Sequence, residues 1–412
     1  MRAGRRTDRE AGRRPGSAAT GATSTGSATR IVVVHPSDEL YGADRVLVEA
    51  VSVLEEAGGG PSRGAEVRVL LPRDVTYPEQ RLTNELRRRG VPVRTTDVPV
   101  LRRDYLHPRA LPALLVRTAR GFVELRRERP DVVYLSTSAA LLVAPLARLL
   151  RAHVVVHVHE TWSRQERVLL GPLLRLCHTV VAVSDAVASG LPLPGTRVTV
   201  VHNGFDVPRA DDRRAAALRD RVGARPDDLV VLVASRWNAW KGHELLLEAW
   251  GRAGREDAHL VVLGAPPPSG QRVDVAALAS ALPDPGRVHV VGESTEVPAW
   301  VLAADVVAVP STRPDPLPTI AIEAAALGRA VLAADSGGLP DIVEDGVTGS
   351  LVPTGDVDAW TDALRALDRS RAREQGTAAA RRFRFLFTRD AFRERLADAL
   401  DVGTPTGATT GG

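Results

Sequence analysis

The chain has few residues of several kinds, and each shortage removes a class of protein from consideration. Its 412 residues include one cysteine, Cys177, so no disulfide can form within the chain. No apolar run approaches the roughly 18 residues that a membrane-spanning helix needs. The arginine-rich start is not followed by the apolar segment of a secretory signal. We therefore expect a globular protein of the cytoplasm, with two domains for a chain of this length.

Acidic residues are scarce at the start of the chain. Residues 1–30 carry seven arginines against Asp8 and Glu10, a formal charge of +5, whereas the whole chain carries +4. The other residues therefore sum to about −1, and the basic character belongs to this segment. We expect residues 1–30 to form a disordered tail. We do not expect nucleic-acid binding, while peripheral contact of the tail with the inner face of an anionic membrane stays open.

Hydrophobic patterning predicts a parallel sheet in the first half of the chain. Short β-branched runs alternate there with longer amphipathic segments, which is typical of a sheet covered by helices on both faces. The expected strands are Ile31–His35, Val67–Leu71, Val132–Leu135, Val154–His159, Val180–Ser184 and Val198–His202, and the expected helices are 44–56, 78–89, 109–128 and 139–151.

The same alternation restarts after the polar stretch VPRADDRR, which contains a proline. The expected strands of the second half are Leu229–Ala234, Leu260–Leu263, Val288–Val291, Val306–Val309 and Val331–Ala334, and helical segments at 356–368 and 389–401 close the chain. Right-handed crossovers make both halves doubly wound α/β domains that face a central cleft. The expected divisions are a first domain at 31–206, a second at 207–388, a helix at 389–402 that packs back towards the first, and a disordered tail at 403–412.

Lysine is the scarcest charged residue. The 54 basic residues are 53 arginines and one lysine, Lys241, which begins a predicted helix just after the strand Leu229–Ala234. Arg236 lies in the same turn, and ligands of open α/β sheets bind at such strand ends. Arginine offers a flat fork and lysine a compact point charge, so the two cations together suit a phosphate group.

A second candidate segment, residues 310–328, reads PSTRPDPLPTIAIEAAALG. Pro318 is expected at the first position of a helix, and Gly328 at its C-terminal cap. The unpaired N–H groups at Thr319 and Ile320 would then point at the end of the preceding strand. Such a helix end favours an anion, and a diphosphate is the usual ligand.

Two carboxylates accompany this helix. Glu323 lies near its start, on a face that can reach a ribose diol, and Asp315 precedes the helix, where it can accept hydrogen bonds from a sugar. Two acids eight positions apart are a weak signal on their own. Their position beside a predicted anion site makes them candidate ligand-binding residues.

Several separated motifs occur in the order typical of one family. They are ELYGADRVL (39–47), VAVSDAVASG (181–190), VTVVHNGFD (198–206), RWNAWKG (236–242), Asp315 separated by seven residues from Glu323-Ala, and DSGGLPDIVEDGVTGSLVP (335–353). Together they resemble the retaining glycosyltransferases of family four, which have the GT-B fold of two Rossmann-like domains. The resemblance covers roughly residues 31–385.

The resemblance implies a catalytic role for four residues. Arg236 and Lys241 would bind the donor diphosphate and stabilise the leaving phosphate. Asp315 would contact the donor sugar, and His159, at the end of its strand, would face the cleft near the reacting sugar. The residues implied in donor binding are Glu323 on the ribose hydroxyls, Gly42 of a glycine loop, Pro318, Thr319, Ile320, Gly292 and Asn203.

Two positions depart from the family pattern. Asp315 stands where the family usually has glutamate, which is one methylene longer. The glycine loop reads Tyr41-Gly42-Ala43-Asp44 where Gly-Gly-Ala-Glu is common.

Some features allow two interpretations. His157 and His159 share one strand face, but no third ligand has zinc-site spacing, so no metal and no cofactor is expected. Gly337-Gly338 is either a tight turn or a close approach to the donor sugar. The basic amphipathic segment 109–129 either covers a sheet or lies on a membrane that bears a lipid-linked acceptor.

The expected function is transfer of a sugar from a nucleoside diphosphate sugar to a glycan, lipid-linked or small-molecule acceptor. Three alternatives stay open. A PLP-dependent phosphorylase would use Lys241 for its Schiff base, and a glycoside hydrolase would use Asp315 and Glu323 as its carboxylate pair. A non-catalytic partner protein would bind the sugar nucleotide without turnover. The base, the sugar and the acceptor are not readable from the residues.

Overall fold

The computed structural model describes residues 28–40, 42–57, 65–102, 105, 107–267 and 272–401. The tail predicted at 403–412 and nearly all of the tail predicted at 1–30 lie outside the described residues. Thr29 and Arg30 are described, and they belong to the first strand rather than to a tail.

The first half of the chain forms a seven-stranded parallel sheet in the order β3-β2-β1-β4-β5-β6-β7. Its strands are β1 (Thr29–Val34), β2 (Ala65–Pro72), β3 (Val93–Thr96), β4 (Val132–Leu135), β5 (His153–Val158), β6 (Thr179–Ala182) and β7 (Val198–Val200). Its helices are α1 (Gly42–Ala57), α2 (Arg81–Arg88), α3 (Leu111–Glu128), α4 (Ala144–Leu149), α5 (Arg164–Leu174) and α6 (Asp185–Gly190), with 3-10 turns η3 (Pro108–Ala110), η4 (Ser138–Val143) and η5 (Gly195–Arg197).

The second half forms a six-stranded parallel sheet in the order β10-β9-β8-β11-β12-β13. Its strands are β8 (Leu229–Ala234), β9 (Ala258–Leu263), β10 (Val288–Gly292), β11 (Val306–Val309), β12 (Ala330–Ala334) and β13 (Gly349–Val352). Its helices are α7 (Asp212–Arg221), α8 (His243–Ala253), α9 (Val275–Ser280), α10 (Val297–Ala303), α11 (Thr319–Ala326), α12 (Leu339–Ile342), α13 (Val357–Arg365), α14 (Arg369–Leu386) and α15 (Arg389–Asp401), with 3-10 turns η6 (Ala239–Lys241) and η7 (Pro285–Arg287). Among the helices described, none has both the length and the apolar content to cross a bilayer.

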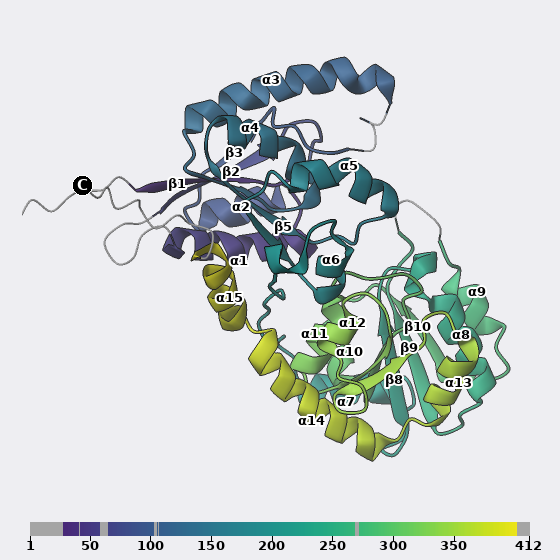
Figure 1. The fold of residues 1–412 in the computed structure, drawn as a ribbon. Helices are drawn as coiled ribbons and strands as arrows, with labels where there is room; N and C mark the ends of the chain where they lie inside the picture. The colour runs from purple at the N-terminus through teal and green to yellow at the C-terminus, as the bar shows by residue number, and fades with distance from the viewer. Residues whose placement is uncertain are drawn as a thin grey trace, which may run out of the picture.

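Helices cover both faces of each sheet, which explains why most strands contain continuous apolar runs (Figure 1). In β1, Val32 and Val34 belong to one buried cluster, whereas Ile31 and Val33 belong to a second cluster that includes α1. Successive side chains of a strand point to opposite faces, so each face needs its own set of apolar residues. The predicted fold of two doubly wound parallel sheets is confirmed.

The elements missed by the sequence patterning include two strands and a long helix. β3 and β13 each pair on one side only, with β2 and β12 respectively, and they carry too few consecutive apolar residues to stand out. The third is α14, whose buried stripe consists mainly of small or polar residues. Its buried members are Ala372, Gln375, Gly376, Ala379 and Phe383.

The chain crosses between the two halves at two adjacent places. One is the segment after β7, and the other is the short link between α14 and α15, where Phe205 N–H donates to Phe387 O at 2.8 Å. Beyond this link, α15 packs on α1, and its Phe392 and Leu396 are fully buried in the core that also holds Ile31 and Val33 (Figure 1). The last helix therefore belongs to the packing of the first sheet.

A polar contact joins the two halves at a third place. The Asp341 carboxylate of α12 accepts a hydrogen bond from the backbone N–H of Asp185, at the start of α6, at 2.7 Å. The same oxygen lies 3.1 Å from His202 Nε2. This carboxylate satisfies a backbone donor at a helix N-terminus in the opposite half of the molecule.

Helix α14 packs against the end of α11 by backbone contact. A Cβ atom on Gly376 would lie 2.1 Å from the Gly328 carbonyl oxygen. Replacing Gly376 by alanine should therefore push α14 away and destabilise the protein by about 1–3 kcal/mol. Urea unfolding measures this loss. Gly190→Ala, at the end of α6 with no atom within 4 Å of the added Cβ, is the matched control and should be neutral. An equal effect of both variants would contradict the packing argument.

The buried His157 makes the free energy of unfolding depend on pH. It is fully buried, its Nδ1 lies 2.7 Å from the Tyr134 hydroxyl, and burial lowers its pKa from 6.5 to about 3. Unfolding therefore takes up a proton below pH 6.5, so stability is complete above that pH and falls as the pH decreases towards 3. We expect this residue to contribute a loss of about 1.4 kcal/mol per pH unit in that window.

The measurement is urea unfolding between pH 7 and pH 5. His157→Gln cannot ionise and should have a shallower pH dependence than the parent protein. His107→Gln, a change at an exposed histidine, should retain the parent's dependence. An unchanged slope in the His157 variant would show that this ring is not the group responsible.

Candidate functional site

A cavity of about 910 Å³ lies between the two sheets and is bounded by residues of both halves. The first half contributes α1 and α2, and the second contributes the carboxyl ends of β8 and β9 together with α10 and α11. Residues of the crossing segment, Gly204 to Asp206, close one side. This is where two open α/β sheets are expected to bind a ligand.

Helix α11 points its N-terminus at this cavity. Thr319 and Ile320 are its first residues and line the cavity, while Pro318 is the N-cap with extended ψ. Pro318 is therefore the N-cap and not the first helical residue as predicted, because its ψ is extended. At the other end, Gly328 adopts a φ of 68°, and the N–H groups of Gly328 and Arg329 bond to Ala325 and Ala324 in a Schellman motif.

Glu323 lies one turn into α11 and also lines the cavity. Burial raises the pKa of its carboxyl above the usual value, and the Arg45 charge on α1 partly opposes this. Arg45 lines the same cavity from the first half of the chain. A carboxylate and a guanidinium therefore face one another across the cleft.

Lys241 and Asp315 form an ion pair at the ends of neighbouring strands β8 and β11. Lys241 Nζ lies 2.5 Å from Asp315 Oδ2, and both side chains are mostly buried. The ammonium also lies 4.2 Å from the centroid of the Trp240 ring, within cation–π range. The structure thus brings together two of the four predicted catalytic residues.

Glycine at 242 makes this pairing sterically feasible. Gly242 has a φ of 78°, and a Cβ atom there would lie 1.8 Å from the Pro310 carbonyl oxygen. The two loops are also joined by the Thr312 N–H, which donates to Trp240 O at 2.8 Å. Only glycine tolerates both the backbone conformation and the approach.

Gly337 and Gly338 support the same loop from the opposite side. Gly338 N–H donates to Asp315 O at 2.8 Å, and a Cβ on Gly337 would lie 2.2 Å from that oxygen. A Cβ on Gly338 would lie 2.1 Å from Pro316 O. The close approach of this glycine pair is thus to the backbone around Asp315.

His159 lies elsewhere, directly after β5 in the first sheet. Its ring is 4.2 Å from that of His157, so the two histidines do share one side of the strand. Burial, with His157 and His35 nearby, holds the pKa of His159 well below its ordinary value. Among the described residues, no hydrogen bond or ion pair links His159 to Lys241 or Asp315.

A polar cluster beside His159 was not anticipated. His35, at the end of β1, has its Nδ1 2.6 Å from Ser136 Oγ and its Nε2 2.5 Å from Asp44 Oδ1. Ser37 Oγ donates to the same carboxylate oxygen at 2.5 Å. The signal in the sequence was a polar residue at the end of each of two strands, His35 after β1 and Ser136 after β4.

The other predicted residues lie around the cleft but do not line the cavity itself. Arg236 follows the lining residue Ser235 and has an exposed side chain. Gly292, with a φ of 87°, precedes the lining residue Glu293. Gly42 begins α1 with a φ of 36°, and the buried Asn203 precedes Gly204, its Oδ1 having no hydrogen-bond partner among the residues described.

Arg45 and Gly264 are among the lining residues that the sequence did not predict. Arg45 follows the glycine loop but looked like one of many surface arginines. Gly264 ends β9 with a φ of 128°, and a Cβ there would lie 1.9 Å from Ser235 O. A glycine directly after the apolar run 260–263 was the available signal for it.

Comparisons with known proteins agree with this geometry. Residues 50–209 match the family described as Glycosyltransferase Family 4, and residues 228–369 match Glycosyl transferases group 1. The D-inositol 3-phosphate glycosyltransferase of Mycobacterium ulcerans (strain Agy99) is 36% identical over 191 residues, which are 45% of this chain and 40% of that protein. The protein of the same name from Xylanimonas cellulosilytica is 35% identical over 248 residues, 54% of this chain and 57% of that one. The chain thus spans about half the length of the curated relatives it matches.

Solved structures show the same architecture over most of the chain. HepE of Anabaena in complex with UDP-glucose superimposes with a TM-score of 0.72 at 22% identity, covering 90% of this chain and 99% of that one. The lipopolysaccharide outer core galactosyltransferase WaaB gives 0.70 at 13% identity, covering 91% and 100%. The two matched families fall in order on the two sheets, and the chain belongs to glycosyltransferase family 4, with the GT-B fold.

Proposed function

We propose that this protein transfers a sugar from a nucleoside diphosphate sugar to a glycan, lipid-linked or small-molecule acceptor, with retention of configuration and without a metal. The observation that carries the proposal is the N-terminus of α11 at the interdomain cavity, with Glu323 one turn further in. The likeness to HepE, whose structure contains UDP-glucose, supports a donor of this class.

The diphosphate would bind between the α11 N-terminus and the two cations after β8. Free N–H groups at Thr319 and Ile320 favour an anion. Lys241 and Arg236 would neutralise the charge that develops on the leaving phosphate, which is the task a metal performs in other enzymes. Glu323 would accept hydrogen bonds from the ribose hydroxyls.

Asp315 would set the position of Lys241 before the donor arrives. The ion pair orients the ammonium at the end of β8, so little ordering remains to be done on binding. With a donor bound, Asp315 would also accept hydrogen bonds from the sugar. Its side chain is one methylene shorter than glutamate, so this contact would be shifted towards the Lys241 side.

Transfer would proceed by displacement on one face of the sugar. The bond between the anomeric carbon and the leaving phosphate oxygen breaks while the acceptor oxygen bonds from the same face, and the acceptor proton passes to the departing phosphate. His159, kept neutral by its lowered pKa, would hydrogen-bond to the donor sugar from the first domain. Gly42, Gly292, Pro318 and Asn203 remain donor-binding residues in this proposal.

The alternatives fit the site less well. A Schiff base on Lys241 or a hydrolytic pair of Asp315 and Glu323 would each require a free side chain. Lys241 and Asp315 instead form an ion pair with each other. A non-catalytic partner protein would bind the donor without turnover, which the assays below distinguish.

Membrane contact by α3 remains part of the proposal. The helix buries only Gly121 and Leu125 fully, so one narrow face covers the sheet. Leu115 is 70% exposed, and Leu111, Val116 and Val123 are also exposed, with exposed arginines alongside. Apolar and basic side chains together suit an anionic membrane surface.

The first test is Lys241→Arg. The planar guanidinium cannot reproduce the ammonium contact in the space between Trp240 and Asp315, so kcat/KM should fall by about 100-fold. The donor is first identified by thermal-shift screening of nucleoside diphosphate sugars. Arg252→Lys, an exposed change on α8, is the matched control and should retain activity. Parent-like turnover in Lys241→Arg would refute the assigned role.

The second test is Glu323→Gln. Loss of a charged acceptor to the ribose diol should raise the donor KM about 10- to 100-fold while kcat changes little. Steady-state kinetics at saturating acceptor measure both constants. Glu248→Gln, at an exposed glutamate of α8, is the control. A fall in kcat with an unchanged donor KM would contradict a binding role.

A further inference from the structure

A second cavity lies at the amino ends of the strands of the second sheet, whereas the cleft lies at their carboxyl ends. This second cavity measures about 250 Å³ and is bounded by residues that precede β11 and β12, together with α7 and the start of α14. Its charged lining residues are Asp212, Arg219, Asp305, Arg329, Arg369 and Arg373. Four arginines against two aspartates leave this small space with an excess of positive charge.

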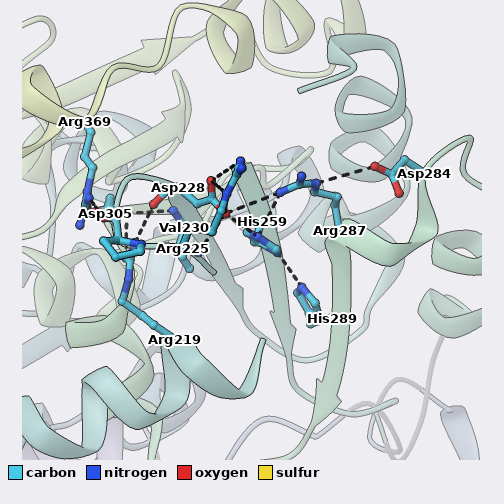
Figure 2. Close-up of polar contacts among 11 residues, drawn as sticks. Arg219, Arg225, Asp228, Val230, His259, Asp284, Arg287, His289, Asp305 and Arg369 are labelled. Carbon is cyan, nitrogen blue, oxygen red and sulfur yellow. Dashed lines mark hydrogen bonds and ion pairs between the residues drawn. The ribbon is translucent and has the colours of Figure 1, made fainter. Parts of the chain in front are cut away.

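Asp305 is fully occupied by two of these arginines and a backbone donor. Arg219 Nη1 lies 2.9 Å from Oδ2, and Arg369 Nε lies 3.0 Å from Oδ1 (Figure 2). The Val230 N–H donates to Oδ2 at 2.8 Å. Arg219 also donates to the carbonyls of Ala303 and Asp228. This half of the cluster is a closed structural network that fixes the start of β8.

The other two arginines have no such partner. Within the described part of the chain, neither the Arg329 nor the Arg373 guanidinium makes a hydrogen bond or an ion pair, and Arg329 Nε is buried without an acceptor. Burial lowers the pKa of Arg329, the negative charges of Asp305 and Asp212 oppose this shift, and the positive charges of Arg219 and Arg373 add to it. Arg329 is partly exposed and Arg373 is exposed, so the costly feature is the buried Arg329 Nε, whose hydrogen bond is not made within the described residues.

We propose that this cavity binds a phosphate dianion, either free or as the terminal group of a small ester, through Arg329 and Arg373. Two guanidinium forks offer paired N–H donors that match phosphate oxygens. An anion there would supply the acceptor that Arg329 Nε lacks and would offset the repulsion between the two arginines. The site is separate from the donor cleft and does not depend on the proposed transferase activity.

The test is thermal unfolding with increasing inorganic phosphate, with ionic strength held constant by sodium chloride. The parent protein should be stabilised, and Arg329→Gln and Arg373→Gln should each need at least tenfold more phosphate for the same shift. Arg373 is exposed, so its replacement keeps the fold intact. Arg381→Gln, an exposed arginine of the same helix, should respond like the parent.

The donor cleft could also bind phosphate, and Lys241→Ala separates the two sites. This variant should keep the part of the response that Arg329→Gln and Arg373→Gln weaken. Loss of the response in Lys241→Ala, or an unchanged response in both Arg329→Gln and Arg373→Gln, would overturn the proposal. Tighter binding of glycerol 3-phosphate than of inorganic phosphate, lost in Arg329→Gln, would support an ester as the ligand. Equal or weaker binding of the ester would support the free ion.

Discussion

Close backbone approach at the carboxyl ends of the second sheet is the constraint on which the site depends. Gly242 allows the turn after β8 to touch Pro310, and Gly337 allows the segment after β12 to touch Asp315. Gly264 brings the end of β9 against Ser235 in the same way. These contacts lock neighbouring loops together, so Lys241 and Asp315 meet in one geometry rather than several. A side chain at any of these glycines would separate loops that must touch.

The cleft has a second requirement, because its two walls belong to different sheets. The chain crosses between them twice at adjacent places, and α15 returns to pack Phe392 and Leu396 into the first core. The Asp341 contact to Asp185 and His202 adds a polar connection. Paired crossings of this kind suit domains that rotate relative to one another, since only a few backbone torsions need to change. The Asp341 contact is the polar bond that such a rotation would have to break.

The charged groups of the second half differ in their contacts between the amino ends and the carboxyl ends of the strands. At the amino ends of its strands, Asp228 and Asp305 gather arginines and histidines into networks in which nearly every donor has an acceptor (Figure 2). Arg225 holds the pKa of Asp228 well below its ordinary value. At the carboxyl ends, Lys241 pairs with Asp315, and Glu323 lines the interdomain cavity. Arg329 resembles the second group although it lies among the first, and this mismatch is what distinguishes its cavity.

The sequence by itself determined the fold class and the family of the molecule. Alternating apolar runs require parallel sheets with covered faces, and the ordered motifs around Lys241, Asp315 and Glu323 identify the family. It failed at β3 and β13, which carry few consecutive apolar residues, and at α14, whose buried stripe consists mainly of small or polar residues. Only the tertiary structure decided that Arg45 faces Glu323, that Asp44 bonds to His35, and that Gly337 and Gly338 support Asp315. The physical reason is that the relative positions of these residues depend on how whole helices and strands pack. A local sequence pattern shows which face of an element is buried, but it does not show which residue lies opposite that face across a cleft.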